Sequence, residues 1–83
     1  MIKGREIGLP TLSERDLEAI RFCVSNDFDY IGLSYVRSAR DVELLRSKLT
    51  SLGGSEIGII SKIETVQAIT NFQEIVDSSD ALL

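Results

Sequence analysis

The chain has 83 residues, of which 43% are hydrophobic and 27% charged, which is typical of one small globular domain or of a segment of a larger one. Nine Lys and Arg residues against thirteen Asp and Glu residues give a net charge of −4, which argues against nucleic acid or an anionic membrane as the main partner. The single cysteine excludes an intrachain disulfide, and the lack of histidine excludes histidine-based zinc sites, Ser-His triads and histidine bases.

Residues 1–12 are expected to form an irregular lead-in, because Gly4, Gly8 and Pro10 interrupt any regular pattern. The first six residues lack the apolar core of a signal peptide. No later apolar run reaches the ~18 residues of a membrane-spanning helix. With one unpaired cysteine, these features favour a cytoplasmic protein.

A first helix is predicted from Ser13 to about Ser25. The Ser13 hydroxyl can cap the helix, and Asp16 stands three residues later, as in a capping box. Asn26 and Asp27 are expected to end it. Its apolar residues recur at helical spacing and should face the core: Leu17, Ile20, Cys23 and Val24. Cys23 is therefore interpreted as a small buried hydrophobe rather than a nucleophile.

Two strands and a second helix follow. Residues 30–36 are rich in β-branched and aromatic side chains and predict a strand. Ser38 should cap a helix that ends at Gly53–Gly54, with an apolar stripe of Val42, Leu45, Leu49 and Leu52. Residues 57–64 are almost continuously apolar, which indicates a strand buried on both faces, as in a parallel sheet.

A third helix should be capped by Thr65 and divided by a second cap at Asn71 and Glu74. Its predicted buried side consists of Val66, Ile69, Phe72, Ile75 and Val76. Residues 80–83 resemble the start of a further strand. The predicted order is helix, strand, helix, strand, helix and strand stub, which indicates an α/β protein with a parallel sheet. A full (β/α)8 barrel needs ~250 residues, so residues 1–83 are interpreted as about one third of such a barrel.

Lys62 and Glu64 are the main candidates for chemistry. Strand alternation places both side chains on one face at the carboxyl end of the strand, where the active sites of parallel α/β folds lie. The alternative is a solvent-facing pair worth at most ~1 kcal/mol. Against that alternative, both charges directly follow a buried apolar run, and a buried charge is costly without a partner or a role.

Three further polar residues lie near the ends of predicted strands. Arg37 follows the first predicted strand and either faces an anionic substrate or is a solvated loop residue. Ser34 either lines the cavity or packs as a small residue, the second being favoured. Asp80 stands at the amino end of its strand, at the opposite end of the barrel from Glu64, and is not expected to share a site with it.

Several stretches resemble the pyruvate kinase family, in the correct order along the chain. Residues 59–64 read I-I-S-K-I-E, similar to the family's I-I-x-K-I-E-N, and residues 9–16 read L-P-T-L-S-E-R-D, similar to L-P-x-L-[ST]-x-[KR]-D. Residues 33–37 with Asp41 and Val42 resemble A-S-F-[VI]-R-x-x-x-D-V, and residues 71–80 follow the spacing of N-[FL]-D-E-I and D-G-I. The resemblance therefore covers nearly the whole chain from Leu9.

This resemblance implies the middle part of a (β/α)8 catalytic barrel that transfers a phosphoryl group from phosphoenolpyruvate to ADP, giving pyruvate and ATP in glycolysis. By position, Lys62 would stabilise charge on the transferring phosphoryl and the enolate oxygen. Glu64 would bind the divalent ion, Mg²⁺ or Mn²⁺. The resemblance also implies K⁺ in the complete enzyme, with ligands outside this chain, and a homo-oligomer.

Some positions depart from the family pattern. Thr65 replaces an Asn, Gln67–Ala68 replace Glu-Gly, Ala81 replaces a Gly, and Leu33 and Tyr35 alter the A-S-F motif. These departures leave open a metal-dependent aldolase or lyase of the phosphoenolpyruvate/pyruvate-binding barrel superfamily, whose I-E-T and N-x-x-E-I residues are also similar. Lys62 and the upstream stretches favour pyruvate kinase.

The family's second metal carboxylate, in an A-R-G-D stretch, would follow Leu83. One lysine and one carboxylate cannot position two substrates and a cation, so the isolated chain is expected to be inactive. A non-catalytic structural or interaction fragment is the remaining alternative.

Overall fold

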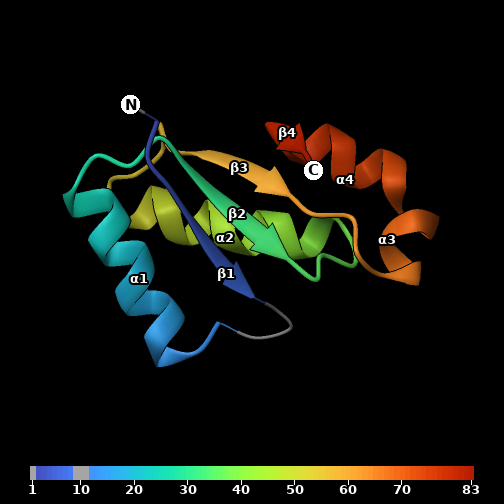
Figure 1. Ribbon diagram of the computed structural model, residues 1–83, viewed down its shortest axis with the longest axis horizontal. Helices are drawn as coiled ribbons and strands as arrows, with labels where there is room; N and C mark the ends of the chain where they lie inside the picture. The colour runs from blue at the N-terminus through green and yellow to red at the C-terminus, as the bar shows by residue number, and fades with distance from the viewer. Residues whose placement is uncertain (1, 9–11) are drawn as a thin grey trace.

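The computed structural model describes residues 2–8 and 12–83. Its elements form one four-stranded parallel sheet in the order β1-β2-β3-β4, with helices between the strands (Figure 1). The elements are β1 (Gly4–Gly8), α1 (Glu14–Ser25), β2 (Tyr30–Ser34), α2 (Ala39–Ser51), β3 (Gly58–Ser61), α3 (Val66–Thr70), α4 (Phe72–Ser78) and β4 (Ala81–Leu82). The predicted α/β class and parallel sheet are confirmed. None of the helices in residues 2–8 and 12–83 has the length and hydrophobicity of a membrane-spanning segment.

Strand β1 corrects the expectation of an irregular lead-in. It pairs in parallel with β2, from Gly4 opposite Tyr30 to Gly8 opposite Ser34. A Cβ built on Gly4 would clash with the Tyr30 ring, so a larger residue there would require this ring to move. Ile7 anchors the strand, being only 4% exposed. One apolar anchor in five residues is too weak a pattern to predict a strand, and the pairing with β2 supplies the rest. Residues 9–11, which carry the L-P-T match, lie outside the described residues.

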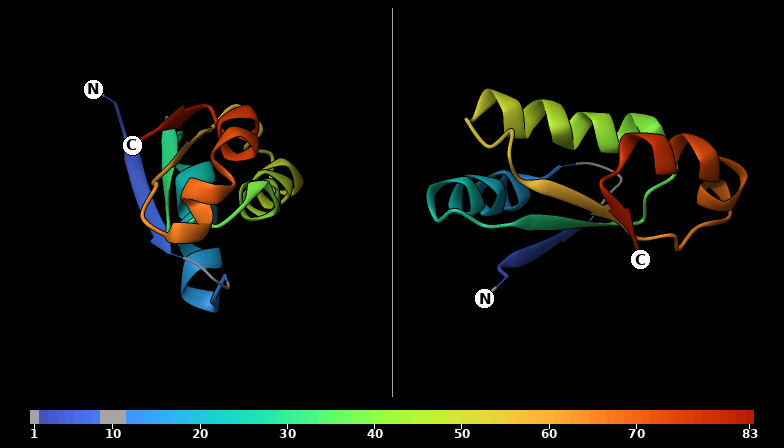
Figure 2. Two further views of the ribbon diagram at one scale, coloured as in Figure 1. Left: turned by 90° about the vertical axis from the view of Figure 1, so that its right-hand side faces the viewer. Right: turned by 90° about the horizontal axis from the view of Figure 1, so that it is seen from above.

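The core lies on one face of the sheet, against α1, α2 and α4. Figure 2 shows α2 and α4 on the same side of the strands, while no helix of residues 2–8 and 12–83 lies on the opposite side. The fully buried large side chains come from both layers: Ile20, Ile31, Leu33, Leu45, Leu49, Ile59 and Ile75. Cys23 is also fully buried, and burial raises the pKa of its thiol despite the opposing effect of the Arg5 charge.

The other sheet face is open, which corrects the prediction that residues 57–64 are buried on both faces. Ile59 and Ser61 are buried against the helices, whereas Gly58 and Ile60 are only partly buried. Both strands are shorter than predicted. Strand β2 ends at Ser34 within the predicted range 30–36, and β3 ends at Ser61 within the predicted range 57–64.

The predicted caps are confirmed at α1 and α3 but not at α2 and α4, since the Asn71 side chain makes no cap bond at the start of α4. Ser13 and Asp16 form the predicted capping box of α1, and Thr65 caps α3 through the Ala68 N–H. Gly53 ends α2 with a φ of +85°, a conformation that glycine adopts without strain. Ser38 precedes α2 but its hydroxyl makes no cap bond.

Two carboxylates lie at the start of α2, and one of them accepts a helix N–H. Asp41 accepts the Arg37 N–H at 2.9 Å, and Glu74 of α4 accepts the Ala39 N–H at 2.9 Å. A carboxylate at a helix N-terminus also interacts favourably with the helix dipole. Tertiary contact thus supplies part of the cap that local sequence was expected to provide.

The predicted buried side of the third helix is wrong at three positions. Val66 is 77% exposed, Ile69 69% and Phe72 46%, while Ala68 and Ile75 are buried. The predicted break at Asn71 does occur, between α3 and α4. In Figure 1, α3 lies beyond the carboxyl end of the sheet, which agrees with the exposure of these three side chains among the described residues.

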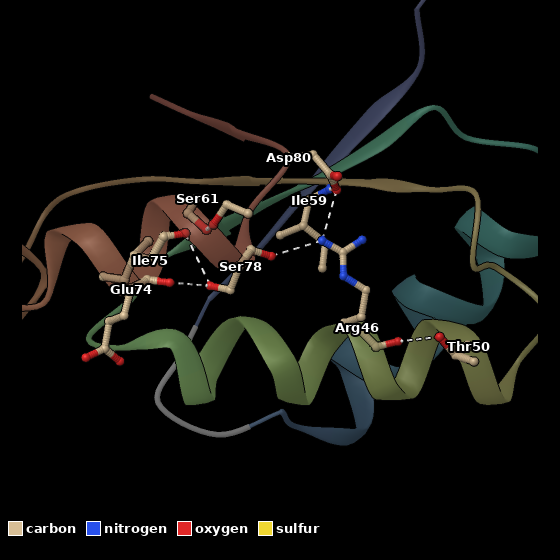
Figure 3. Close-up of polar contacts among 9 residues, drawn as sticks. Arg46, Thr50, Ile59, Ser61, Glu74, Ile75, Ser78 and Asp80 are labelled. Carbon is tan, nitrogen blue, oxygen red and sulfur yellow. Dashed lines mark hydrogen bonds and ion pairs between the residues drawn. The ribbon is translucent and has the colours of Figure 1, made fainter.

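Asp80 joins three elements at the amino ends of the strands, as expected of a residue at the opposite end from Glu64. Its Oδ2 accepts the Ile59 N–H at 2.7 Å and an Arg46 guanidinium N–H at 3.1 Å (Figure 3). Arg46 also donates to the Ser78 carbonyl at 3.1 Å. Asp80 therefore has a structural role, linking α2 and β3 to the start of β4.

Candidate functional site

The carboxyl ends of β1, β2 and β3 meet at one edge of the sheet because the strands are parallel. Lys62 follows β3 directly, and its backbone N–H donates to the Leu33 carbonyl at 3.0 Å. Its Nζ donates to Glu6 Oε1 of β1 at 2.7 Å. The Lys62 side chain is 24% exposed and that of Glu6 61%. The lysine is the more enclosed member of this ion pair.

Glu6 was missed by sequence reasoning. The only available signal was the alternation of Glu6 and Ile7 within a short segment flanked by glycines. Glu6 and Lys62 are 56 residues apart in the chain, so no local pattern could pair them.

The surroundings of Lys62 favour its charged form. The hydrogen bond to Glu6 raises the pKa of Lys62, and the negative charges of Glu6 and Glu64 and a smaller influence of Tyr35 act in the same direction. Partial desolvation opposes them. Because the ordinary pKa of a lysine is already far above neutrality, Lys62 is a cation at physiological pH.

Glu64 lies at the same edge but bonds to a different group. Its Oε1 accepts the Tyr35 N–H at 3.2 Å, just after the end of β2. Tyr35 has a φ of +59°, which is unusual for a residue other than glycine. Lys62 and Glu64 thus act on each other through charge, without a direct bond, and Glu64 is exposed.

Whether these residues suit a divalent ion depends on their oxygens. Glu64 is exposed and offers a carboxylate, which Mg²⁺ prefers together with water and substrate oxygens. Among residues 2–8 and 12–83, no group of three or more His, Cys, Asp or Glu residues could hold a metal ion. The chain therefore suits such an ion as a donor of one carboxylate ligand.

The other two predicted site residues, Ser34 and Arg37, make no hydrogen bond to Lys62 or Glu64 among the described residues. Ser34 is the last residue of β2, opposite Gly8, and is partly buried. Arg37 donates through Nε and Nη2 to Asp41 at 3.3 and 3.2 Å, and these bonds raise the pKa of Arg37. The Arg37 side chain is 45% exposed and that of Asp41 10%. Arg37 is a cation whose orientation is set by α2.

A hollow of about 260 Å³ lies on the open face of the sheet. Its lining residues are Glu6, Tyr30, Gly32, Ile60, Lys62, Ala81, Leu82 and Leu83. A larger hollow of about 300 Å³ lies at the amino ends of the strands and contains Asp27, Asp29 and Glu56 but no cation. The open-face hollow therefore combines apolar walls with the Glu6–Lys62 ion pair at the carboxyl edge.

Comparison with known proteins points to one family. The family model described as "Pyruvate kinase, barrel domain" matches residues 1–83. The chain is 40% identical over 82 residues to a pyruvate kinase of Dictyostelium discoideum, covering 99% of this chain and 16% of that protein. It is 42% identical over 77 residues to a pyruvate kinase of Methanocaldococcus jannaschii, covering 93% of this chain and 17% of that protein. A pyruvate kinase of Candida albicans is 40% identical over 82 residues, with 99% and 16% covered. The chain thus spans about one sixth of the length of these relatives.

Proposed function

The chain belongs to the pyruvate kinase family, and from this premise we propose that it is a segment of a catalytic barrel that transfers a phosphoryl group from phosphoenolpyruvate to ADP. The products would be pyruvate and ATP. The matches to pyruvate kinases do not favour the aldolase or lyase alternative, nor a non-catalytic fragment.

The observation that carries the proposal is the Lys62 ammonium at the carboxyl edge, held 2.7 Å from a carboxylate oxygen and lining the open-face hollow. Phosphoryl transfer needs positioning and neutralisation of charge more than covalent help from the protein. Lys62 would donate to an oxygen of the transferring phosphoryl group and to the enolate oxygen as charge develops there. A compact ammonium suits this role.

Glu64 would hold the divalent ion, Mg²⁺ or Mn²⁺, through a carboxylate that the Tyr35 N–H orients. When bound, such an ion would neutralise negative charge on the phosphate oxygens. The second carboxylate and the ligands of K⁺ would come from other parts of the barrel.

Two residues have secondary roles in the proposal. Arg37 would attract anionic substrate to this edge, because its guanidinium stays charged and nearly half exposed. Ser34 would line the cavity beside it, since alternation places its side chain on the face of Gly32.

Residues 1–83 would be inactive alone and would form about one third of the barrel domain. The complete enzyme would be a cytoplasmic homo-oligomer.

The test is a coupled assay of pyruvate formation. We expect no turnover by the 83-residue chain. In an enzyme that carries this segment within a complete barrel, Lys62→Met should lower kcat by about 10²- to 10³-fold, the scale of losing one transition-state donor. Circular dichroism should show an unchanged fold. The matched control is Lys48→Met, in the last turn of α2, which should keep kcat. A near-normal kcat for Lys62→Met would refute the proposal.

A further inference from the structure

The ion pair between Glu6 and Lys62 spans an intervening strand. The register places Glu6 opposite Gly32 and Gly32 opposite Ile60, so these residues form one row across β1, β2 and β3. Lys62 follows Ile60 by two residues and has the same facing. Neighbouring strands are ~4.8 Å apart, so the pair crosses roughly 10 Å of sheet.

Gly32 provides the space for this crossing. A Cβ built on Gly32 would lie 3.3 Å from Glu6 Cγ and 3.7 Å from Glu6 Oε1. The Glu6 side chain therefore lies over the backbone of β2. Gly32 does not have a positive φ, so its backbone conformation in β2 does not require glycine. What glycine supplies is an unobstructed path from β1 toward Lys62.

The ion pair with Glu6 uses only part of the hydrogen-bonding capacity of the Lys62 ammonium. An ammonium has three donor hydrogens, and Glu6 is the only side-chain acceptor of Nζ among the described residues. Two hydrogens remain for an anion in the hollow that both side chains line. Glu6 is also the more exposed partner, so water solvates the carboxylate while the ammonium is held against the sheet.

We propose that Glu6 is a positioning residue, which reaches across Gly32 and holds the Lys62 ammonium at the carboxyl edge in the orientation that receives a phosphoryl oxygen. This inference rests on the proposed function for the role of Lys62. It adds to that function a residue from β1 and a glycine whose lack of a side chain serves the site. Without Glu6, the flexible lysine stem would sample many rotamers and spend less time over the hollow.

The first test needs no activity. In the 83-residue chain with isotope-labelled lysine, NMR should show slowed hydrogen exchange of the Lys62 ammonium. Glu6→Gln should abolish this slowing, and Gly32→Val should do the same by blocking the crossing. Glu18→Gln, on the exposed side of α1, is the matched control and should leave the exchange rate unchanged. An unchanged Lys62 spectrum in folded Glu6→Gln would overturn the inference.

The second test uses an enzyme with the segment in a complete barrel. Glu6→Gln should lower kcat about tenfold, a size typical of residues that orient a functional group, with KM for phosphoenolpyruvate changed less than twofold. Glu6→Asp should recover part of the loss. A purely structural role would lower Tm but leave kcat per folded molecule within twofold, and that result would overturn the inference. If Lys62→Met also kept a normal kcat, the proposed function itself would be refuted. If Glu6→Gln kept a normal kcat while Lys62→Met lost it, only the proposed role of Glu6 would be refuted.

Discussion

Tyr35 shows how one residue connects backbone strain to the candidate site. It follows the last residue of β2, has a φ of +59° and directs its N–H to the Glu64 carboxylate. A left-handed conformation costs a non-glycine residue about 1 kcal/mol or more. Strain of this kind persists where surrounding contacts determine the backbone. Here the backbone N–H, rather than the exposed tyrosine ring, contacts Glu64.

Replacing Tyr35 tests this account. Tyr35→Gly should change the free energy of unfolding by less than about 0.5 kcal/mol, because relief of strain offsets the greater backbone entropy of glycine in the unfolded chain. The control is Tyr30→Gly, an extended residue whose ring lies over Gly4, and it should cost about 2 kcal/mol. Urea unfolding measures both. A loss at Tyr35 as large as that at Tyr30 would contradict the explanation.

At the scale of elements, α2, β3 and β4 are linked through one carboxylate. The bond from the Ile59 N–H, followed by the Arg46 guanidinium, lowers the pKa of Asp80, while partial burial opposes them. A lowered pKa in the folded state stabilises the protein above the ordinary value near 3.8. That stability is lost as the pH falls through the folded value.

The Asp80→Asn variant should therefore be less stable at pH 7 by about 1 kcal/mol, a modest value because the side chain is half exposed. The difference in stability between Asp80→Asn and the wild type should shrink as the pH falls below about 3.8. Thermal unfolding at pH 7 and pH 3 measures it. Glu56→Gln, an exposed change outside this contact, should show no such convergence. An equal deficit for Asp80→Asn at both pH values would contradict the linkage.

At the scale of the whole molecule, the sheet has one covered face and one open face. The Cα radius of gyration is 11.8 Å, close to the value of about 12 Å expected of a compact chain of this length. The strands β1 and β4 are nevertheless edge strands, and edge strands with unpaired backbone groups are prone to associate with other chains.

We therefore expect the 83-residue chain to self-associate. Sedimentation velocity should show species larger than the monomer that increase with protein concentration. Leu83→Lys, which places a charge beside β4 at a residue that is 79% exposed, should reduce this association. Glu56→Lys, away from both edges, is the control. A compact monomer at high concentration would count against the prediction.

Local signals in the sequence determined most of the elements. The capping box of Ser13 and Asp16, the Thr65 cap and the Gly53 stop all act within a few residues, so they can be read from the sequence before the fold is known. The alternation of helices and strands likewise predicted the parallel sheet. The position of Lys62 and Glu64 at the carboxyl ends of strands followed from the same alternation.

Only the tertiary structure decided the contacts between distant segments. It made a strand of Gly4–Gly8, paired Glu6 with Lys62 across Gly32, and supplied Glu74 to the start of α2. It also left Val66 and Ile69 exposed despite their apolar spacing. The physical reason is that capping and helical periodicity depend on neighbours within about one turn. Strand pairing, ion pairing and burial depend instead on which remote segments the fold brings into contact.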